Sequence, residues 1–234
     1  MKSESIGNYL KAIYQIQERQ NDQPVSTTRL AAQLGVASAS VTGMLKRLSA
    51  GEPKLVDYEP YYGATLTEAG RKSALELIRH HRLIESYLNQ ALGYPWDAVH
   101  AEAERLEHVI SEEMEERLAA ALGHPATDPH GDPIPDREGH FEKRDDPCLA
   151  DLADGQRAEI RRVVAQEPEL LRYLAELGLT PSVQFELVSS APFNGPVTLR
   201  VLGAQPSERV IGREIAEKIL VAPYHNTVTE PSHE

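Results

Sequence analysis

The sequence predicts a mainly α protein that ends in a small β domain, and three observations lead to this fold class. Residues 5–122 carry apolar side chains at helical spacing, interrupted by one pair of short strand-like segments. Residues 124–147 are rich in Pro, Asp, His and Gly, as in an extended linker. After residue 148, several short strand-like segments follow one another, which is typical of a compact β-barrel.

The first segment predicts the order of elements found in a winged helix-turn-helix. A helical stripe at residues 5–19 is broken by the polar stretch 21–24, and Ser26 can cap a short helix at 29–34. Gly35 stands where a tight turn favours positive φ. A second helix at 38–50 follows, then strands at 55–58 and 64–66 with a turn between them. Helix, turn, helix and hairpin together predict a DNA-binding domain over residues 1–72.

The remaining elements predict a helical middle domain and a β-rich end. One long helix is expected from residue 67 to about 90, and one or two more from 96 to 122. Strands are expected at 157–164, 183–189 and 196–202, with a helix at 170–177 and short strands at 209–211 and 219–222. We therefore divide the chain into residues 1–72, 73–146, 147–223 and a tail at 224–234.

Charge is distributed unevenly along the chain, whose formal net charge is -12. Residues 1–80 carry 10 Lys and Arg against 8 Asp and Glu, whereas residues 81–146 carry 6 against 16. Only the first part can approach phosphate without strong repulsion, and the acidic middle part favours cations. The single cysteine, Cys148, excludes an intrachain disulfide, which fits a reducing cytoplasm. No apolar run is long enough for a membrane span.

The second helix of the helix-turn-helix predicts the DNA contacts. Small residues at its start let the helix approach base edges, and hydroxyl groups bind phosphates or bases. Two basic residues follow about two turns later, within reach of phosphates. The predicted DNA-binding residues are Thr27, Thr28, Ser38, Ala39, Ser40, Thr42, Gly43, Lys46, Arg47 and Tyr61, the last at the tip of the wing. The alternative is a small helical domain whose hairpin serves only for packing.

Histidine and glutamate residues at helical spacing predict a metal site in the middle domain. His100, Glu104, Glu107 and His108 share one face of a helix at about 100° per residue. An earlier helix offers His81 and Glu85 at i and i+4, and the adjacent His80 is expected to face solvent. Imidazole nitrogen and carboxylate oxygen suit Mn²⁺, Fe²⁺, Co²⁺ or Zn²⁺. The alternative is a solvated charged face, which we expect for the run Glu112, Glu113, Glu115 and Glu116.

Several motifs in order resemble the diphtheria toxin repressor and manganese transport regulator family. They are NYLKAIY at residue 8, LTEAGR at 66, HHRLIE at 80, HAEAERLEHV at 100 and PHGDPIP at 129, within a match over residues 4–135. Residues 149–222, with LADLADGQ, LLRYLAELGL and APFNGPVTLRV, resemble the ferrous iron transport protein A-like domain. The resemblance implies a homodimeric, metal-dependent repressor, not an enzyme, that binds a palindromic DNA operator.

The resemblance also implies which residues hold metal. Glu104, Glu107 and His108 would bind one ion with a group from Asn8, while His81, Glu85 and His100 complete that site or form a second one. Asp128 and His130 stand where some three-domain relatives place further ligands, and a carboxylate of the appended domain, Glu167 or Glu169, would join them. Glu104 replaces the Cys of iron-sensing members, which favours Mn²⁺ over Fe²⁺. Lys11 replaces a Glu of the manganese regulators, so their two-metal cluster is not expected intact.

Two other functions compete with a metal-dependent repressor. One is a winged-helix regulator that senses an organic ligand or no ligand, which the His and Glu face disfavours. The other is a carboxylate-bridged metalloenzyme, which needs an open coordination position and a general base. The sequence contains no HExxH motif and no glycine-rich phosphate loop, so the enzyme is the weaker alternative.

Overall fold

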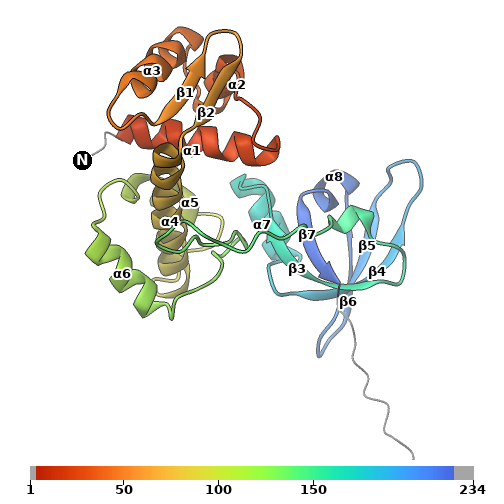
Figure 1. Cartoon of the computed structure of the whole chain (residues 1–234). Coiled ribbons are helices and arrows are strands. Elements are labelled where there is room, and N and C mark those ends of the chain that lie inside the picture. The colour runs from red at the N-terminus through yellow and green to blue at the C-terminus, as the bar shows by residue number, and fades with distance from the viewer. Residues whose placement is uncertain (1–3, 224–234) are drawn as a thin grey trace, which may run out of the picture. The chain divides into compact units, whose positions relative to one another are not determined.

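The structure, a computed structural model, describes residues 4–223 and divides into two compact units (Figure 1). The first unit comprises residues up to 84, then 102–126 and 134–141. The second comprises residues 85–101, 127–133 and 142 onwards. The expected tail at 224–234 lies outside the described residues, and the division into three domains and a tail stays a prediction.

The first unit begins with a helix-turn-helix and a hairpin. Helices α1 (Glu4–Arg19), α2 (Thr27–Leu34) and α3 (Ser38–Ala50) precede strands β1 (Val56–Glu59) and β2 (Gly63–Leu66). Ser26 caps α2 by accepting a hydrogen bond from the amide of Arg29, at 3.2 Å. Gly35 ends α2 with φ of 65°, the left-handed conformation that glycine adopts without strain. These local signals explain where α2 begins and ends, although the helix starts at Thr27, two residues before the expected start at Arg29.

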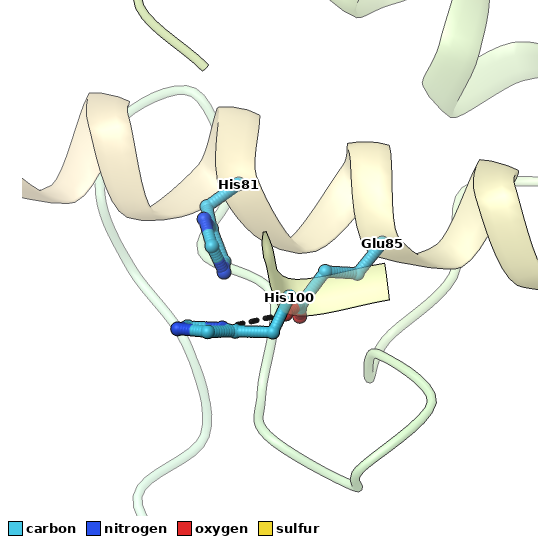
Figure 2. A group of neighbouring side chains, drawn as sticks. All are labelled: His81, Glu85 and His100. Atoms are coloured by element: carbon cyan, nitrogen blue, oxygen red, sulfur yellow. Dashed lines mark hydrogen bonds and ion pairs between the residues drawn. The ribbon is translucent and has the colours of Figure 1, made fainter. Parts of the chain in front are cut away.

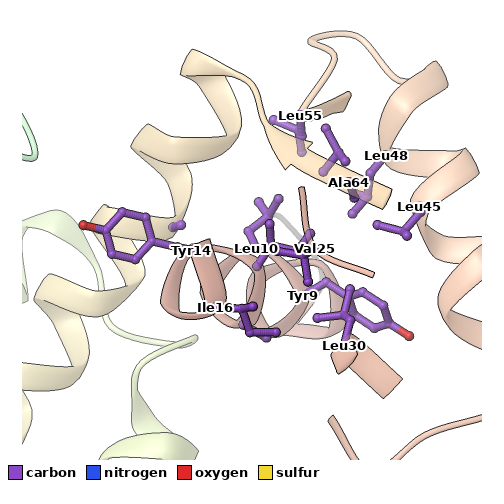
Figure 3. Packing of buried hydrophobic residues seen from close by; sticks show 14 of the residues in the cluster. Tyr9, Leu10, Tyr14, Ile16, Val25, Leu30, Leu45, Leu48, Leu55 and Ala64 are labelled. Atoms are coloured by element: carbon purple, nitrogen blue, oxygen red, sulfur yellow. The ribbon is translucent and has the colours of Figure 1, made fainter. Parts of the chain in front are cut away.

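One apolar core joins these elements, as Figure 3 shows. Leu10 and Ile13 of α1, Leu30 of α2 and Leu45 of α3 are fully buried. Val25, which precedes α2, pairs through its backbone with Ala64 of β2. This pairing holds the hairpin against the core. Burial of such side chains contributes about 1.5–3 kcal/mol each, so α1 is held firmly against the helix-turn-helix.

The middle of the chain supplies three further helices, and the division between the units falls within the first two of them. They are α4 (Glu68–Gln90), α5 (Val99–Leu106) and α6 (Glu112–Ala121). Ser111 caps α6 by accepting from the amide of Met114 at 3.2 Å. Because α5 ends at Leu106, Glu107 and His108 lie in the turn that follows it. The expectation of one helical face carrying all four predicted ligands is therefore wrong for these two residues.

The second unit contains a five-stranded antiparallel sheet in the order β6-β5-β4-β3-β7. Its strands are β3 (Arg157–Val163), β4 (Gln184–Ser190), β5 (Val197–Val201), β6 (Ser207–Ile211) and β7 (Ile219–Pro223). A short helix η1 (Leu149–Asp151) precedes them, and α7 (Pro168–Glu176) and α8 (Arg213–Ala216) lie between strands. Phe185 and Leu187 alternate inward from β4 and are fully buried.

The mainly α fold with a small β domain is thus confirmed, with one difference. In the described residues β6 and β7 form the two edges of the sheet and do not pair, so the sheet is open where a closed barrel was expected. No helix among the described residues is long and apolar enough to cross a membrane.

Candidate metal centre

A buried acidic group in the second unit brings together one residue of α4 and two of the loop 127–133. Glu85 and His130 are fully buried, and Asp128 is 5% exposed. One ligand atom from each lies within 4.8 Å of the others. Oxygen and imidazole nitrogen donors that converge in this way can bind a divalent cation.

The histidine of this group is oriented for such a role. His130 Nε2 donates to the backbone oxygen of Trp96 at 2.8 Å, and the two rings stack with centroids 5.6 Å apart. Its buried Nδ1 has no hydrogen-bond partner among the described residues, with Glu85 Oε2 3.8 Å away. A hydrogen bond on one ring nitrogen fixes the other for a metal.

The electrostatics of the group also fit a cation. Burial favours the neutral imidazole, but the carboxylates of Glu85 and Asp128 outweigh it and raise the pKa of His130 to about 9. Two buried carboxylates therefore face one imidazole, an arrangement short of positive charge. The residues present fit a bound divalent ion.

The loop that carries Asp128 and His130 is fixed to strand β3. The amide of Val163 donates to the carbonyl oxygen of His130 at 2.9 Å. Arg162 pairs with Asp132 at 2.6 Å. Gly131 has φ of 89°, and a Cβ there would overlap the backbone of Arg161. A segment expected as an extended linker is thus ordered and partly buried at these residues.

His100 extends the group on its more exposed side. Its Nδ1 lies 3.1 Å from Glu85 Oε1, and its side chain is 34% exposed. Figure 2 shows this contact, with His81 and Glu85 on successive turns of α4. Glu167 and Glu169, the alternatives for a further carboxylate, are well exposed and pair with Lys218 and Arg172.

The other predicted ligands gather around Lys11 of α1 in the first unit. His81, Glu104 and Glu107 offer ligand atoms within 4.8 Å of one another. Lys11 Nζ donates to Glu107 Oε2 at 2.7 Å and to Glu104 Oε1 at 2.9 Å. It also lies 3.2 Å from His81 Nδ1, which in turn contacts Glu107. This group already contains a positive charge, so it does not fit a metal ion as it stands.

Asn8 and His108 form the edge of the same cluster. His108 Nε2 donates to Asn8 Oδ1 at 2.7 Å and lies 3.5 Å from Glu107 Oε1. Gly7 makes this approach possible, because a Cβ there would lie 2.9 Å from the His108 ring. The turn after α5 is thereby joined to α1.

A third polar group corrects two expectations. His80 is 7% exposed and Glu115 5%, although the sequence placed both in solvent. His80 Nε2 lies 2.9 Å from Glu115, and Arg79 Nε donates to the same carboxylate at 2.6 Å. Burial alone would raise the pKa of Glu115, but hydrogen bonds from His80 and Arg79 lower it to about 2. Packing of α6 against α4 explains the difference, since α4 is covered on more than one side.

The predicted DNA-binding residues lie on the outer side of the helix-turn-helix. Thr28, Ser38, Ala39, Ser40, Gly43, Lys46, Arg47 and Tyr61 are exposed, and Thr27 and Thr42 are partly buried. On α3 the opposite face carries the buried Val41, Leu45 and Leu48. The Thr42 hydroxyl donates to the carbonyl of Ser38 at 3.0 Å. The role of these residues in DNA binding stays a prediction.

Three family models match successive parts of the chain. The N-terminal DNA-binding domain of iron dependent repressors matches residues 1–64, and their metal binding and dimerisation domain matches residues 67–136. The FeoA domain matches residues 148–223. The diphtheria toxin repressor of Corynebacterium efficiens is 32% identical over 192 residues, which cover 78% of this chain and 76% of that protein. The chain belongs to the iron-dependent repressor family.

Other relatives place this repressor-family chain near both iron and manganese proteins. The iron-dependent repressor IdeR of Mycobacterium tuberculosis is 39% identical over 127 residues, 54% of each chain. The chain therefore spans about half the length of the IdeR proteins that it matches. A solved manganese-dependent transcriptional repressor in complex with manganese is 34% identical, with a TM-score of 0.82, and the match covers 94% of this chain and all of that one. The family resemblance is confirmed.

Proposed function

We propose that this chain is a metal-dependent, DNA-binding transcriptional repressor that controls genes of metal homeostasis. The observation that carries the proposal is the buried group of Glu85, Asp128 and His130, which lies in a chain that also has an exposed helix-turn-helix. The relatives are named as repressors, which favours a regulator over an enzyme. The expected cytoplasmic location follows from action on DNA.

We propose that Glu85, Asp128 and His130 hold the divalent ion, with His100 beside Glu85. A bound ion supplies positive charge that neutralises two buried carboxylates. Trp96 keeps His130 oriented through its backbone oxygen. Donors without sulfur favour Mn²⁺ or Fe²⁺ over softer ions, and the solved relative with bound manganese supports Mn²⁺ as the first ion to test.

Repression requires that metal and DNA favour the same arrangement of the chain. A ligand shifts such an equilibrium only by its difference in affinity for the two states. We propose a homodimer, so that two helix-turn-helix units meet a palindromic operator whose half-sites lie about one helical turn or a multiple apart.

The test is selection of duplexes from a random-sequence DNA library by the whole chain with Mn²⁺ and, separately, with chelator. We expect palindromic sequences only with Mn²⁺, and their affinity then measures metal dependence in a gel-shift assay. Asp128→Asn should abolish this dependence, whereas Asp145→Asn, at an exposed carboxylate of the same unit, should leave it unchanged. Equal DNA binding with and without chelator would contradict the proposal.

A further inference from the structure

A lysine side chain lies among carboxylates that the sequence predicted as metal ligands. Lys11 Nζ donates to Glu104 and Glu107 at 2.9 and 2.7 Å. We propose that this ammonium is a built-in cation that replaces a metal ion in the cluster, so that the cluster joins α1 to the turn after α5 without metal. The inference adds to the proposed function, because it decides which of the predicted ligands are left for metal.

The donors of the ammonium match the acceptors around it. An ammonium has three donors, and three predicted ligands lie within hydrogen-bond distance: Glu104, Glu107 and, at 3.2 Å, His81 Nδ1. His81 Nδ1 also contacts Glu107, so its tautomer decides which of the two contacts it serves. Either way, both carboxylates receive a charge-assisted hydrogen bond from Lys11.

Burial makes it costly to replace Lys11 with another cation. The Lys11 side chain is 9% exposed and that of Glu107 is fully buried, while Glu104 is 41% exposed. A buried charge that loses its partner is strongly destabilised, because water cannot replace the lost interaction. Departure of Lys11 would leave Glu107 in that condition until another cation arrived.

Charge repulsion opposes a metal ion beside the lysine. A divalent ion held by Glu104 and Glu107 would lie within a few ångströms of the ammonium, and like charges at such distances repel strongly when shielded from water. The ion would therefore have to displace Lys11 completely. In the second unit, Glu85 and Asp128 of the proposed site face the His130 imidazole, whose Nδ1 lies 3.8 Å from Glu85 Oε2, and an imidazole can give up its proton and become a metal ligand.

Asn8 and His108, which lie beside the Lys11 cluster, also contact each other directly, without a metal ion. His108 uses Nε2 to donate to Asn8 on α1. The Lys11 contacts and this hydrogen bond therefore give α1 two polar attachments to the segment 104–108. The expected consequence is one tightly bound divalent ion per chain, held by the Glu85 group.

Titration calorimetry of the whole chain with Mn²⁺ tests the inference. Wild type should bind one tight equivalent, and Glu104→Gln should leave this number and affinity unchanged. Lys11→Gln removes the competing charge, so it should take up a second equivalent, which Lys11→Gln combined with Glu104→Gln should lose. Lys11→Arg keeps the positive charge and should bind one equivalent, like wild type.

Chemical unfolding without metal gives a second measurement. Lys11→Gln should unfold at lower urea concentration than wild type. Excess Mn²⁺ should raise the urea midpoint of Lys11→Gln by more than it raises that of Lys11→Arg. If Lys11→Gln fails to fold, wild type and Glu104→Gln still decide. Loss of one Mn²⁺ equivalent in Glu104→Gln, or no gain in a folded Lys11→Gln, would overturn the inference.

Asp128→Asn separates this inference from the proposed function. If that variant keeps the wild-type Mn²⁺ equivalent, the assignment of metal to the Glu85 group fails. The roles of Lys11 and Glu104 are judged from their own variants, whose result does not depend on Asp128.

Discussion

Replacement of Glu115 by Gln should destabilise the first unit in a pH-dependent way. The carboxylate is buried and receives hydrogen bonds from Arg79 and His80. Its pKa falls from 4.5 to about 2 on folding, and at about 1.36 kcal/mol for each pKa unit this corresponds to roughly 3 kcal/mol at pH 7. Glu115→Gln should therefore lower the free energy of unfolding by about that amount, because it removes the charge that both partners stabilise.

The sign of the pH dependence follows from the lowered pKa. The stabilisation by Glu115 is fully present above pH 4.5 and is lost as the pH falls through about 2. The difference between wild type and Glu115→Gln should therefore shrink steadily below pH 4.5. Comparison of the two proteins at each pH removes the contribution of the other carboxylates.

Urea unfolding followed by far-ultraviolet circular dichroism measures this difference, since most of the helical residues belong to the first unit. Glu113→Gln is the matched control, because Glu113 lies on the same helix and forms an exposed pair with Arg117, which contributes little. Equal losses for Glu115→Gln and Glu113→Gln at pH 7, or a loss independent of pH, would refute the argument.

Three further changes address packing and DNA binding. Gly70→Ala should cost about 2 kcal/mol in unfolding experiments, since a Cβ there would overlap the carbonyl oxygen of Leu55; an unchanged midpoint would contradict this. Phe185→Ala should cost about 3–5 kcal/mol, because the ring is fully buried; fluorescence of Trp96, in the same unit, follows it. Lys46→Ala should weaken binding to all duplexes alike and lower the salt dependence by about one phosphate contact, and a sequence-dependent loss would argue for a base contact instead.

The fold was predictable because its signals are local. Apolar periodicity, the Ser26 cap and Gly35 placed the helix-turn-helix, and the strand expected at 183–189 is close to β4. The end of α5 at Leu106 was missed, because the His and Glu residues from His100 to His108 keep the spacing of a helix although the helix has ended. The cap at Ser111 was the signal for that end.

The site was less predictable because it depends on packing between distant segments. His80 and Glu115 were expected in solvent, and only the approach of α6 to α4 makes them a buried pair. Asp128 and His130 were readable as ligands by resemblance, but the burial of their loop came from contacts with β3. Lys11 was recognised as a departure from the family, and its place among the carboxylates required the structure.

The loop 127–133 is attached to β3, so the proposed metal site depends on the stability of the C-terminal sheet. Two of the three proposed ligands sit on backbone that the sheet holds in register, through Val163 and Gly131. Local unfolding of β3 would free the loop that carries Asp128 and His130. The affinity of the proposed site for its cation should therefore fall when the sheet is destabilised. By reciprocity, a cation held by the proposed ligands would stabilise the sheet in return, so metal and the C-terminal sheet would support each other.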